Sequence, residues 1–525
     1  MGKILPTYRK VLVEEFVDNI TANSSQYYAF ASHPIEIEGA APEVSNNDYD
    51  NTFTFNWNIL FGKKINGNDV VPVISKNIWT TNTVYGMYDN TSNTVYSNNI
   101  FYAITEPSIT GGLYYIYKCI DNANGSASTI DPSSIGTPTQ PSTFTTDDGY
   151  KWRYISTISA ANYEKFSSDD YAPVYTDATI SASSQNYSGV DVVMISNAGS
   201  GYTAYRNNPN TDIVQSNPNT TIIQIADDAS DSDNFYVNSA IYIYNTLETT
   251  SQLKIVSDYF VNSKGEKFIV TDSSVNTSLI IPGLTKYLIS PAVIFESDGD
   301  SDPSAYAVVN TSNYSISEIV MLNSGSNISW ANVSIQAGYG SGANVYAIVP
   351  PPGGHGFDAP SELNVKGLAV SFDFANNESN TIPTANIVYN KIGMVKNPYT
   401  LVSNTADGSA SKGSIYNTAT FDNLYVVNVS PSYTFTKGET IIGANSGSRG
   451  VVVFSNSSQA YITCDQTFID GEYVANTAGT NLTTIAIQTT PDIYTKDLKP
   501  IYVENINNIN RSNTQTESYK LIIEI

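Results

Sequence analysis

The side chains best suited to acid–base, nucleophilic or metal chemistry are scarce in this chain. Its 525 residues include two histidines and two cysteines, against 38 tyrosines. Histidine is the commonest general base and metal ligand near neutral pH, and the cysteine thiolate is the usual nucleophile or soft ligand. His355 lies in a glycine-rich loop and is expected to bond to the backbone, while His33 precedes Pro34 in a turn. Cys119 and Cys464 are far apart, which predicts free buried thiols rather than a disulfide framework or a zinc site.

One acidic run has the spacing of a calcium-binding loop. Asp298, Asp300 and Asp302 occupy alternate positions, as the first ligands of such a loop do. However, Pro303 stands where the loop needs glycine, and Val309 stands where it needs a bidentate glutamate. A solvated acidic turn is therefore favoured over a metal site. The same interpretation applies to a second acidic set, Asp228, Asp231 and Asp233.

Motifs for covalent or phosphate chemistry are missing from the sequence. There is no Gly-x-Ser-x-Gly elbow, although a Ser-His-Asp triad stays open because its members meet only in space. Gly199-Ser200-Gly201 follows a predicted strand without a helix signature after it, so it is not a phosphate loop. Carboxylate pairs for glycoside cleavage cannot be identified from spacing. We therefore assign no catalytic, cofactor-binding or metal residue, expect no cofactor, and predict that the chain is not an enzyme.

The charge balance argues against a nucleic-acid partner. The chain has 49 acidic against 25 basic residues, a formal net charge of −24, and only 14% charged residues. Lys63-Lys64 is the only adjacent basic pair after Arg9-Lys10, and nucleic-acid binders need a basic stripe. No apolar run approaches the roughly 18 residues of a membrane span, and the first ten residues lack the apolar stretch of a secretory signal. We expect no nucleic-acid and no membrane partner.

The elements that would carry these residues are mostly strands. Leu12, Phe16 and Ile20 form an apolar stripe that predicts a helix over 8–20, and a short second helix is expected at 56–64. A strand at 70–75 is expected at a sheet edge because Pro72 interrupts it. Alternating large and polar residues predict further strands at 26–32, 99–105, 112–120, 150–158, 219–225, 240–244, 267–271, 343–349, 451–454 and 519–525.

Two weak internal repeats mark added modules. Residues 193–200 are similar to 320–326, and each couples an apolar run to a glycine turn, as hairpin-building units do. Residues 435–441 recur at 468–474, with a spacing that suits a small barrel or sandwich of short strands. The Pro-Pro-Pro-Gly-Gly-His-Gly run at 350–356 is a boundary by composition.

These signals predict a mainly β, multi-domain antiparallel β-sandwich with a few short helices and an inserted β domain. The many tyrosines should pack in half-buried sheet faces or serve protein–protein interfaces. The predicted segments are a core part at 1–178, an inserted Gly/Ser/Asn-rich β domain at 179–350, a return to the core at 351–415, a barrel-like module at 416–490, and a C-terminal strand segment completing the core at 491–525.

Several segments, taken in order, are similar to one known family. The matching runs are YIYKCID at 115–121, DGYKWRY at 148–154, Tyr8-Arg9, Tyr27-Tyr28, IYVEN at 501–505, Arg511, QTE at 515–517 and KLII at 520–523, with PPGGHG at 351–356 and KIG at 391–393 similar to larger members. In this order they resemble the baseplate wedge subunit, protein 8 type, of T-even-like contractile-tailed bacteriophages. The resemblance covers about the first 175 residues, scattered segments after 350 and the last 25.

The resemblance implies a non-enzymatic virion component, mainly a β-sandwich with short helices. It implies a homodimer that joins other wedge proteins within a six-fold tail baseplate, assembled in the host cytoplasm and working as a rigid scaffold. The stretches 179–350 and after 416 depart from the family, so their roles do not carry over. Two alternatives remain: a carbohydrate-binding or depolymerising phage tail protein, and a bacterial surface adhesin or layer protein, which would need an export route.

Overall fold

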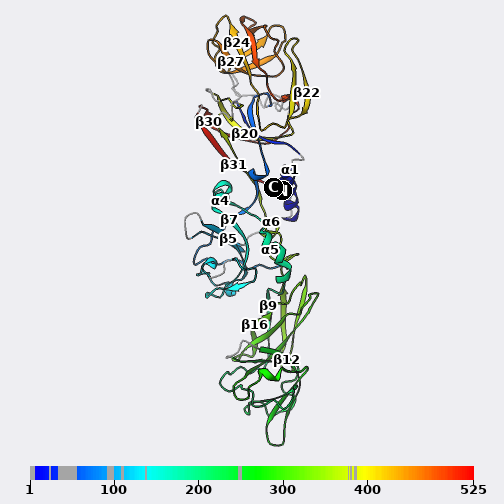
Figure 1. The fold of residues 1–525 in the computed structure, drawn as a ribbon. Coiled ribbons are helices and arrows are strands. Elements are labelled where there is room, and N and C mark those ends of the chain that lie inside the picture. Colours follow the sequence, from blue (N-terminus) through cyan, green and yellow to red (C-terminus); the bar gives the residue numbers. More distant parts are fainter. Residues whose placement is uncertain are drawn as a thin grey trace. The chain divides into compact units, whose positions relative to one another are not determined.

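The fold is mainly β, with antiparallel sheets and a few short helices, as the sequence predicts. The computed structural model describes residues 6–22, 25–33, 56–91, 100–107, 112–135, 139–245, 251–376, 378, 381–383, 387–512 and 514–525. The chain divides into two compact units. Figure 1 shows the strands and helices coloured along the sequence. Unit 1 comprises residues 1–73, 164–173 and 366–525, and unit 2 comprises residues 74–163 and 174–365.

Unit 1 contains two sheets that share one aromatic core. The first sheet has the order β23-β2-β1-β20-β30 and the second has the order β31-β19-β3-β8. Phe61 of the first sheet packs on Phe374 of the second, with ring centroids 5.0 Å apart, and the hydroxyls of Tyr389 and Tyr519 are 2.5 Å apart. The strands and helix of this part are α1 (Pro6–Thr21), β1 (Tyr27–Ser32), β2 (Ile59–Lys64), β3 (Val70–Ser75), β8 (Tyr171–Pro173), β19 (Gly367–Ala375), β20 (Val388–Lys396), β23 (Thr420–Asp422), β30 (Pro500–Asn510) and β31 (Thr516–Glu524).

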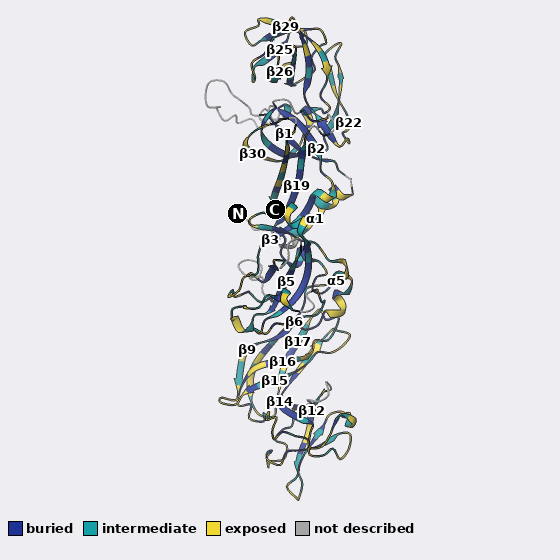
Figure 2. Cartoon of the chain, turned by 60° about the vertical axis from the view of Figure 1, so that its left-hand side comes forward, coloured by how far each residue is buried: buried dark blue, intermediate teal, exposed yellow. Residues whose placement is uncertain are grey.

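The burial of these strands explains why the sequence forms them. Every residue of β1 is buried because the strand is central in its sheet, and Figure 2 shows this burial along the neighbouring strands. The helix α1 covers the predicted stripe, with Ile20 buried. The last strand, β31, pairs with β19 over nine residues, from Gly367↔Glu524 to Ala375↔Thr516, so the predicted terminal strand is confirmed.

A closed barrel follows the sandwich in unit 1. Its strand order is β24-β27-β26-β25-β28-β29, and the two repeat copies lead into β25 and β28, which pair with each other. Phe435 and Phe468, the first residues of the two copies, both lie in the barrel core. The barrel strands are β24 (Tyr425–Ser430), β25 (Thr440–Gly443), β26 (Arg449–Ser455), β27 (Gln459–Cys464), β28 (Tyr473–Asn476) and β29 (Asn481–Thr489), and a hairpin of β21 (Tyr399–Asn404) and β22 (Ser409–Ile415) precedes them.

Unit 2 begins with a four-stranded sheet of order β4-β5-β7-β6. Its core stacks Trp152 on Tyr150 and sets Tyr85 edge-on against Trp152. The elements are β4 (Tyr102–Thr105), β5 (Leu113–Asp121), β6 (Phe144–Thr145) and β7 (Lys151–Ser159), followed by α4 (Ala160–Phe166), α5 (Ala178–Ser183) and the 3-10 turn η4 (Ser184–Tyr187).

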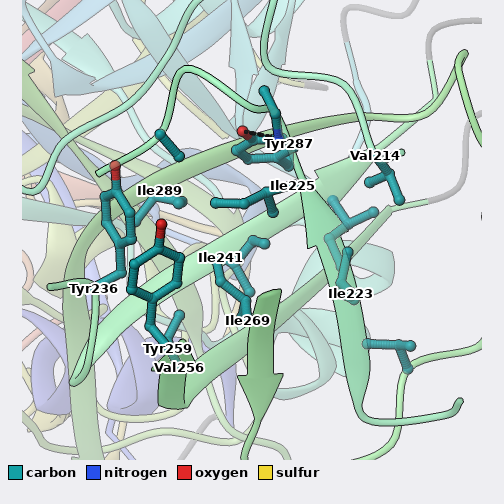
Figure 3. Close-up of a cluster of buried hydrophobic side chains, with 14 of the residues drawn as sticks. Val214, Ile223, Ile225, Tyr236, Ile241, Val256, Tyr259, Ile269, Tyr287 and Ile289 are labelled. Carbon is teal, nitrogen blue, oxygen red and sulfur yellow. Dashed lines mark hydrogen bonds between the residues drawn. The ribbon is translucent and has the colours of Figure 1, made fainter. Parts of the chain in front are cut away.

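The remainder of unit 2 is the β-rich stretch that the sequence places at 179–350. Its largest sheet has the order β10-β13-β12-β11-β14-β15-β16, with β17 also pairing with β14. Figure 3 shows the buried cluster on one face, where Ile241, Tyr259, Ile269 and Tyr287 meet. The strands are β9 (Val192–Ser200), β10 (Ile222–Ile225), β11 (Ser239–Tyr244), β12 (Ser251–Val261), β13 (Lys267–Thr271), β14 (Lys286–Ser297), β15 (Ser304–Asn310), β16 (Ser315–Asn323), β17 (Ala331–Gln336) and β18 (Ser341–Ile348).

Three local predictions are wrong. The expected helix at 56–64 is mostly strand β2, because Ile59, Leu60 and Phe61 are all fully buried in the sheet between β1 and β23. The expected edge strand at 70–75 lies between β19 and the short β8. The glycine turn after β9 does not build a hairpin, since β9 pairs with the distant β18.

Candidate functional site

Five ionisable side chains meet inside unit 2. Lys118 and Arg153 come from β5 and β7, and Asp191 precedes β9. His355 lies in the loop after β18, and Glu362 ends the short helix α6 (Ala359–Glu362). We call this set the buried ion cluster. Asp191 and His355 lie close to the two ends of the predicted insertion at 179–350. The cluster therefore links the chain segments at both ends of the insertion to β5 and β7.

His355 is held between two carboxylates. Its Nδ1 lies 2.5 Å from Glu362 Oε1 and its Nε2 lies 2.8 Å from Asp191 Oδ2, and the histidine side chain is fully buried. The glycines around it permit this placement. Gly354 and Gly356 have φ of +88° and +78°, and a Cβ on Gly354 would lie 2.5 Å from the Ser184 carbonyl oxygen. The expectation that His355 bonds to the backbone is therefore wrong, because the loop turns its ring inward onto side chains.

Lys118 and Glu362 form the tightest ion pair of the cluster. Lys118 Nζ lies 2.8 Å from Glu362 Oε1 and 3.2 Å from the centre of the Tyr88 ring. The other carboxylate oxygen of Glu362 accepts the backbone N–H of Gly356 at 2.6 Å. Burial alone would raise the pKa of Glu362, but Lys118 and His355 outweigh it and hold that pKa well below its usual range. Burial lowers the pKa of Lys118, and Glu362 acts in the opposite direction.

Arg153 differs from the other members of the cluster. It is 3% exposed and lies beneath Tyr187, with its Cζ 5.9 Å from the ring centre. Within the described residues, its Nε and Nη2 have no hydrogen-bond partner. Burial lowers the pKa of its guanidinium, while Asp191 and Glu362 oppose that shift. The ion pairs of the cluster can thus hold the two ends of the insertion against β5 and β7. Two buried donors, Nε and Nη2 of Arg153, have no acceptor among the described residues.

Sequence reasoning found one of these five residues. Lys118 and Arg153 could have been noticed as charges between aromatic or apolar neighbours, Tyr117 and Cys119 in β5 and Trp152 and Tyr154 in β7. Asp191 and Glu362 carry no comparable signal, since they lie at element ends remote from both strands. Only the fold brings them to His355.

The acidic runs bind backbone and basic groups in the structure. Asp298 accepts the N–H groups of Ser329 and Trp330 at 2.9 and 3.1 Å. The Ser329 hydroxyl, and to a smaller degree these N–H groups, lower the pKa of Asp298. Asp300 accepts a bond from Asn327 at 3.2 Å. Among the described residues, no group of three or more His, Cys, Asp or Glu side chains is placed to hold a metal ion. In the second set, Asp228 pairs with Arg206 at 2.6 Å, Asp231 pairs with Lys267 at 3.0 Å, and Asp233 accepts the Val261 N–H at 2.8 Å.

The remaining candidates are not members of the cluster. Cys119 and Cys464 are both buried free thiols, and burial raises the pKa of each. His33 is buried after β1, and its backbone N–H donates to the Asn58 carbonyl at 2.9 Å. Pro34 lies outside the described residues. Gly199 at the end of β9 has φ of +61°. It packs against β18, since a Cβ there would lie 2.5 Å from the Ala343 backbone nitrogen.

A carboxylate pair that spacing could not reveal joins the two ends of the barrel. Asp422 ends β23 just before the barrel, and Asp492 follows its last strand β29. The Asp422 N–H donates to Asp492 Oδ2 at 2.8 Å, and the Asp492 N–H donates to the Asp422 carbonyl at 2.9 Å. Burial and, to a smaller degree, Asp492 raise the pKa of Asp422 to about 8.

Two surface features also bear on function. The strand β30 is the outer strand of its sheet, and Ile501 and Val503 on it are each 43% exposed. In unit 2 a hollow of about 210 Å³ is lined by Trp330, Tyr346, Asn332 and other uncharged residues, and Trp330 is 48% exposed. Among the described residues, no helix is long and apolar enough to cross a bilayer.

No family model matches the chain, and no curated protein matches it either.

Proposed function

We propose that the chain is a structural subunit of a contractile-tail baseplate wedge, which holds neighbouring wedge proteins together without a covalent step. The observation that supports this proposal is where the resembling segments lie. The two runs at 115–121 and 148–154 form β5 and β7, which pair directly with Cys119 opposite Trp152. The runs at 501–505 and 520–523 lie on β30 and β31, the outer strands of the two sheets of unit 1. These four runs thus lie wholly or partly on strands of the sheets.

Among the described strands, β30 pairs only with β20, and its other side suits a contact with a neighbouring subunit. An outer strand offers unpaired backbone N–H and C=O groups to another chain. Ile501 and Val503 add exposed apolar area on the same strand. A permanent contact within a wedge, or between two copies of this chain, should bury on the order of 2,000 Å² or more.

The proposal is tested by assembly. The full chain, expressed together with the other wedge proteins of its phage, should co-purify with them and occupy the baseplate in a map of the tail. Replacing Ile501 and Val503 with lysine should block assembly, because charges on an outer strand oppose strand pairing. The matched control replaces Val402 and Ile415, exposed at 54% and 45% on the β21–β22 hairpin. A stable monomer that binds no wedge protein would contradict the proposal.

A carbohydrate-binding tail protein is the second candidate, and one observation favours it. The hollow beside Trp330 combines an exposed aromatic ring with amide and hydroxyl groups. Such a lining suits a neutral polar ligand, because aromatic faces and a few placed polar groups are typical of small-ligand pockets. Incubating the chain with host polysaccharide should then give binding that Trp330→Ala abolishes, and a reducing-end assay would reveal any cleavage. Absence of binding would remove this candidate.

A further inference from the structure

The hollow beside Trp330 lies where two successive strands separate. β17 and β18 follow each other in the chain, but β17 pairs with β14 and β18 pairs with β9. Among the described strands, β17 and β18 share no ladder with each other. The hollow, of about 210 Å³, lies away from the segment that joins them, between residues 331–333 of β17 and 346–347 of β18. The separation of the two strands thus creates a pre-formed space in unit 2.

The lining of the hollow combines aromatic rings with amides. Trp330, which is 48% exposed, and Tyr346 supply the rings. Asn332 supplies one amide from β17, and Asn90 supplies another next to Val349, whose N–H it accepts at 3.1 Å. Amides both donate and accept hydrogen bonds, as sugar hydroxyls require, and an aromatic face packs against the apolar face of a sugar ring. Among the described residues, no Asp, Glu, Lys, Arg or His lines the hollow, whereas a phosphate or carboxylate ligand would need a cation.

Two carboxylates outside the lining hold lining residues in place. Asp298 accepts the N–H groups of Ser329 and Trp330 at 2.9 and 3.1 Å, so the backbone that carries the indole is fixed. Likewise, Asp89 accepts the N–H and the hydroxyl of Thr91 at 2.8 and 2.6 Å. A site that is ordered before binding loses less conformational freedom when its ligand arrives. The exposed indole is therefore a fixed surface on which a ligand can pack.

We propose that the hollow binds one neutral pyranose ring, either a free sugar or the end of a glycan. The apolar face of the ring packs on Trp330, its hydroxyls bond to the amides of Asn90 and Asn332, and Asp298 is a positioning residue that sets the indole. Pockets for drug-sized ligands measure about 300–1,000 Å³, so a hollow of about 210 Å³ takes one ring rather than several. The inference rests on the second candidate function, whose hollow it shares. It is independent of the assembly role, because β30 belongs to unit 1.

Saturation-transfer NMR on the full chain tests the proposal. Glucose, galactose, mannose and N-acetylglucosamine are titrated separately, and at least one should bind with a dissociation constant of about 1 mM, as expected for a single small ring. The uronate of the same sugar carries a carboxylate on the same ring. It should bind at least about tenfold more weakly, because the lining offers no cation. A polysaccharide that ends in the preferred sugar should displace the monosaccharide if the site takes glycan ends, and should leave it bound if the site takes only free sugars.

Variants separate the packing surface from its positioning residue. Trp330→Ala should weaken sugar binding at least about tenfold, because it removes the aromatic face. Tyr314→Ala is the control, since Tyr314 is an aromatic residue of unit 2 that is 43% exposed but does not line the hollow. It should keep the full affinity. Asp298→Ala should weaken binding several-fold although the indole is present, and Asp298→Asn, which keeps an acceptor oxygen for the two N–H groups, should restore most of the affinity.

Asn332→Leu gives a second variant at an exposed position of β17, where the change removes the amide at similar side-chain size. It should weaken binding several-fold, and it decides the matter if Trp330→Ala does not fold. The proposal is overturned if none of the neutral sugars receives saturation at about 10 mM, a concentration well above the expected dissociation constant. It is also overturned if the uronate binds equally well, or if a folded Trp330→Ala or Asn332→Leu keeps the original affinity. Asn332→Leu should still co-purify with the wedge proteins, so a failure of sugar binding and a failure of assembly are distinguishable.

Discussion

Two buried arginines, one in each unit, differ in how many of their nitrogens have a hydrogen-bond partner. Arg511 in unit 1 is 1% exposed, and every one of its nitrogens is bonded. Its Nε lies 3.1 and 3.2 Å from the two Glu517 oxygens, while Nη1 and Nη2 donate to backbone carbonyls. Its Cζ also lies 4.9 Å from the Phe61 ring centre. Arg153 in unit 2 is equally buried but has two unused donors. Burial alone therefore does not tell how much an arginine stabilises its unit.

The largest effect is expected from Arg511→Met. The substitution leaves the Glu517 carboxylate and several carbonyls buried without their donor, and breaking a buried ion pair in this way costs about 3–5 kcal/mol. Hydrogen exchange followed by mass spectrometry separates the units, and β19 and β31 of unit 1 should lose protection. Arg153→Met should reduce the protection of β5 and β7 much less, because no protein acceptor loses a bond from Nε or Nη2 of Arg153. If both variants lost the same amount of hydrogen-exchange protection, the claim that Arg511 stabilises its unit more than Arg153 would be refuted.

Glu362→Gln should destabilise unit 2 by about 3 kcal/mol at neutral pH, since it removes the buried counter-charge of Lys118. The folded pKa of Glu362 lies below its unfolded value of 4.5. Its contribution is therefore complete above pH 4.5 and is lost as the pH falls below that value. Denaturant unfolding at several pH values should give a steep acid loss in the unmodified chain and a shallower one in Glu362→Gln. Parallel curves would contradict the role of Glu362.

Asp422→Asn extends the comparison to a half-buried acid, and this substitution should raise the stability of unit 1 at high pH. The folded pKa of Asp422, about 8, lies above the unfolded value of 3.8, so this carboxyl stabilises unit 1 fully only below pH 3.8. The contribution of Asp422 to the unfolding free energy of unit 1 is lost as the pH rises from 3.8 to about 8. Because Asp422 is partly exposed, Asp422→Asn should gain only about 1 kcal/mol at pH 8 relative to pH 4. A variant that loses stability at pH 8 would refute this assignment.

The smallest effect is expected from an exposed ion pair. Lys165 lies 3.1 Å from Asp69 in unit 1, with the two side chains 38% and 26% exposed. Lys165→Met should change the unfolding free energy by less than about 1 kcal/mol, because water screens such pairs. Equilibrium urea unfolding measures it against Arg511→Met in the same unit. If Lys165→Met lowered the unfolding free energy as much as Arg511→Met, burial would not determine how much an ion pair contributes to stability.

Local sequence predicts a strand correctly where apolar and polar residues alternate along it or where turn residues bound it. Residues 267–271 form β13 as predicted, and the two Phe-x-x-Gly-Glu copies indicate the barrel because each brings a turn and a short strand. In both copies the glutamate closes its own turn: Glu439 accepts the Thr436 N–H and Glu472 accepts the Ile469 N–H. The helix predicted at 56–64 failed because a short apolar run fits either element, and sheet burial decided it.

The sequence by itself determined the β character, many of the strand positions, a small barrel or sandwich at the two repeats and the scarcity of reactive side chains, because these depend on residue types and on spacings of a few positions. The tertiary structure alone decided that Lys118, Arg153, Asp191, His355 and Glu362 meet, and that Asp422 lies against Asp492. These contacts join residues up to 244 positions apart. Long-range strand pairing creates them, and side-chain charge becomes decisive only after such pairing has removed the water around it.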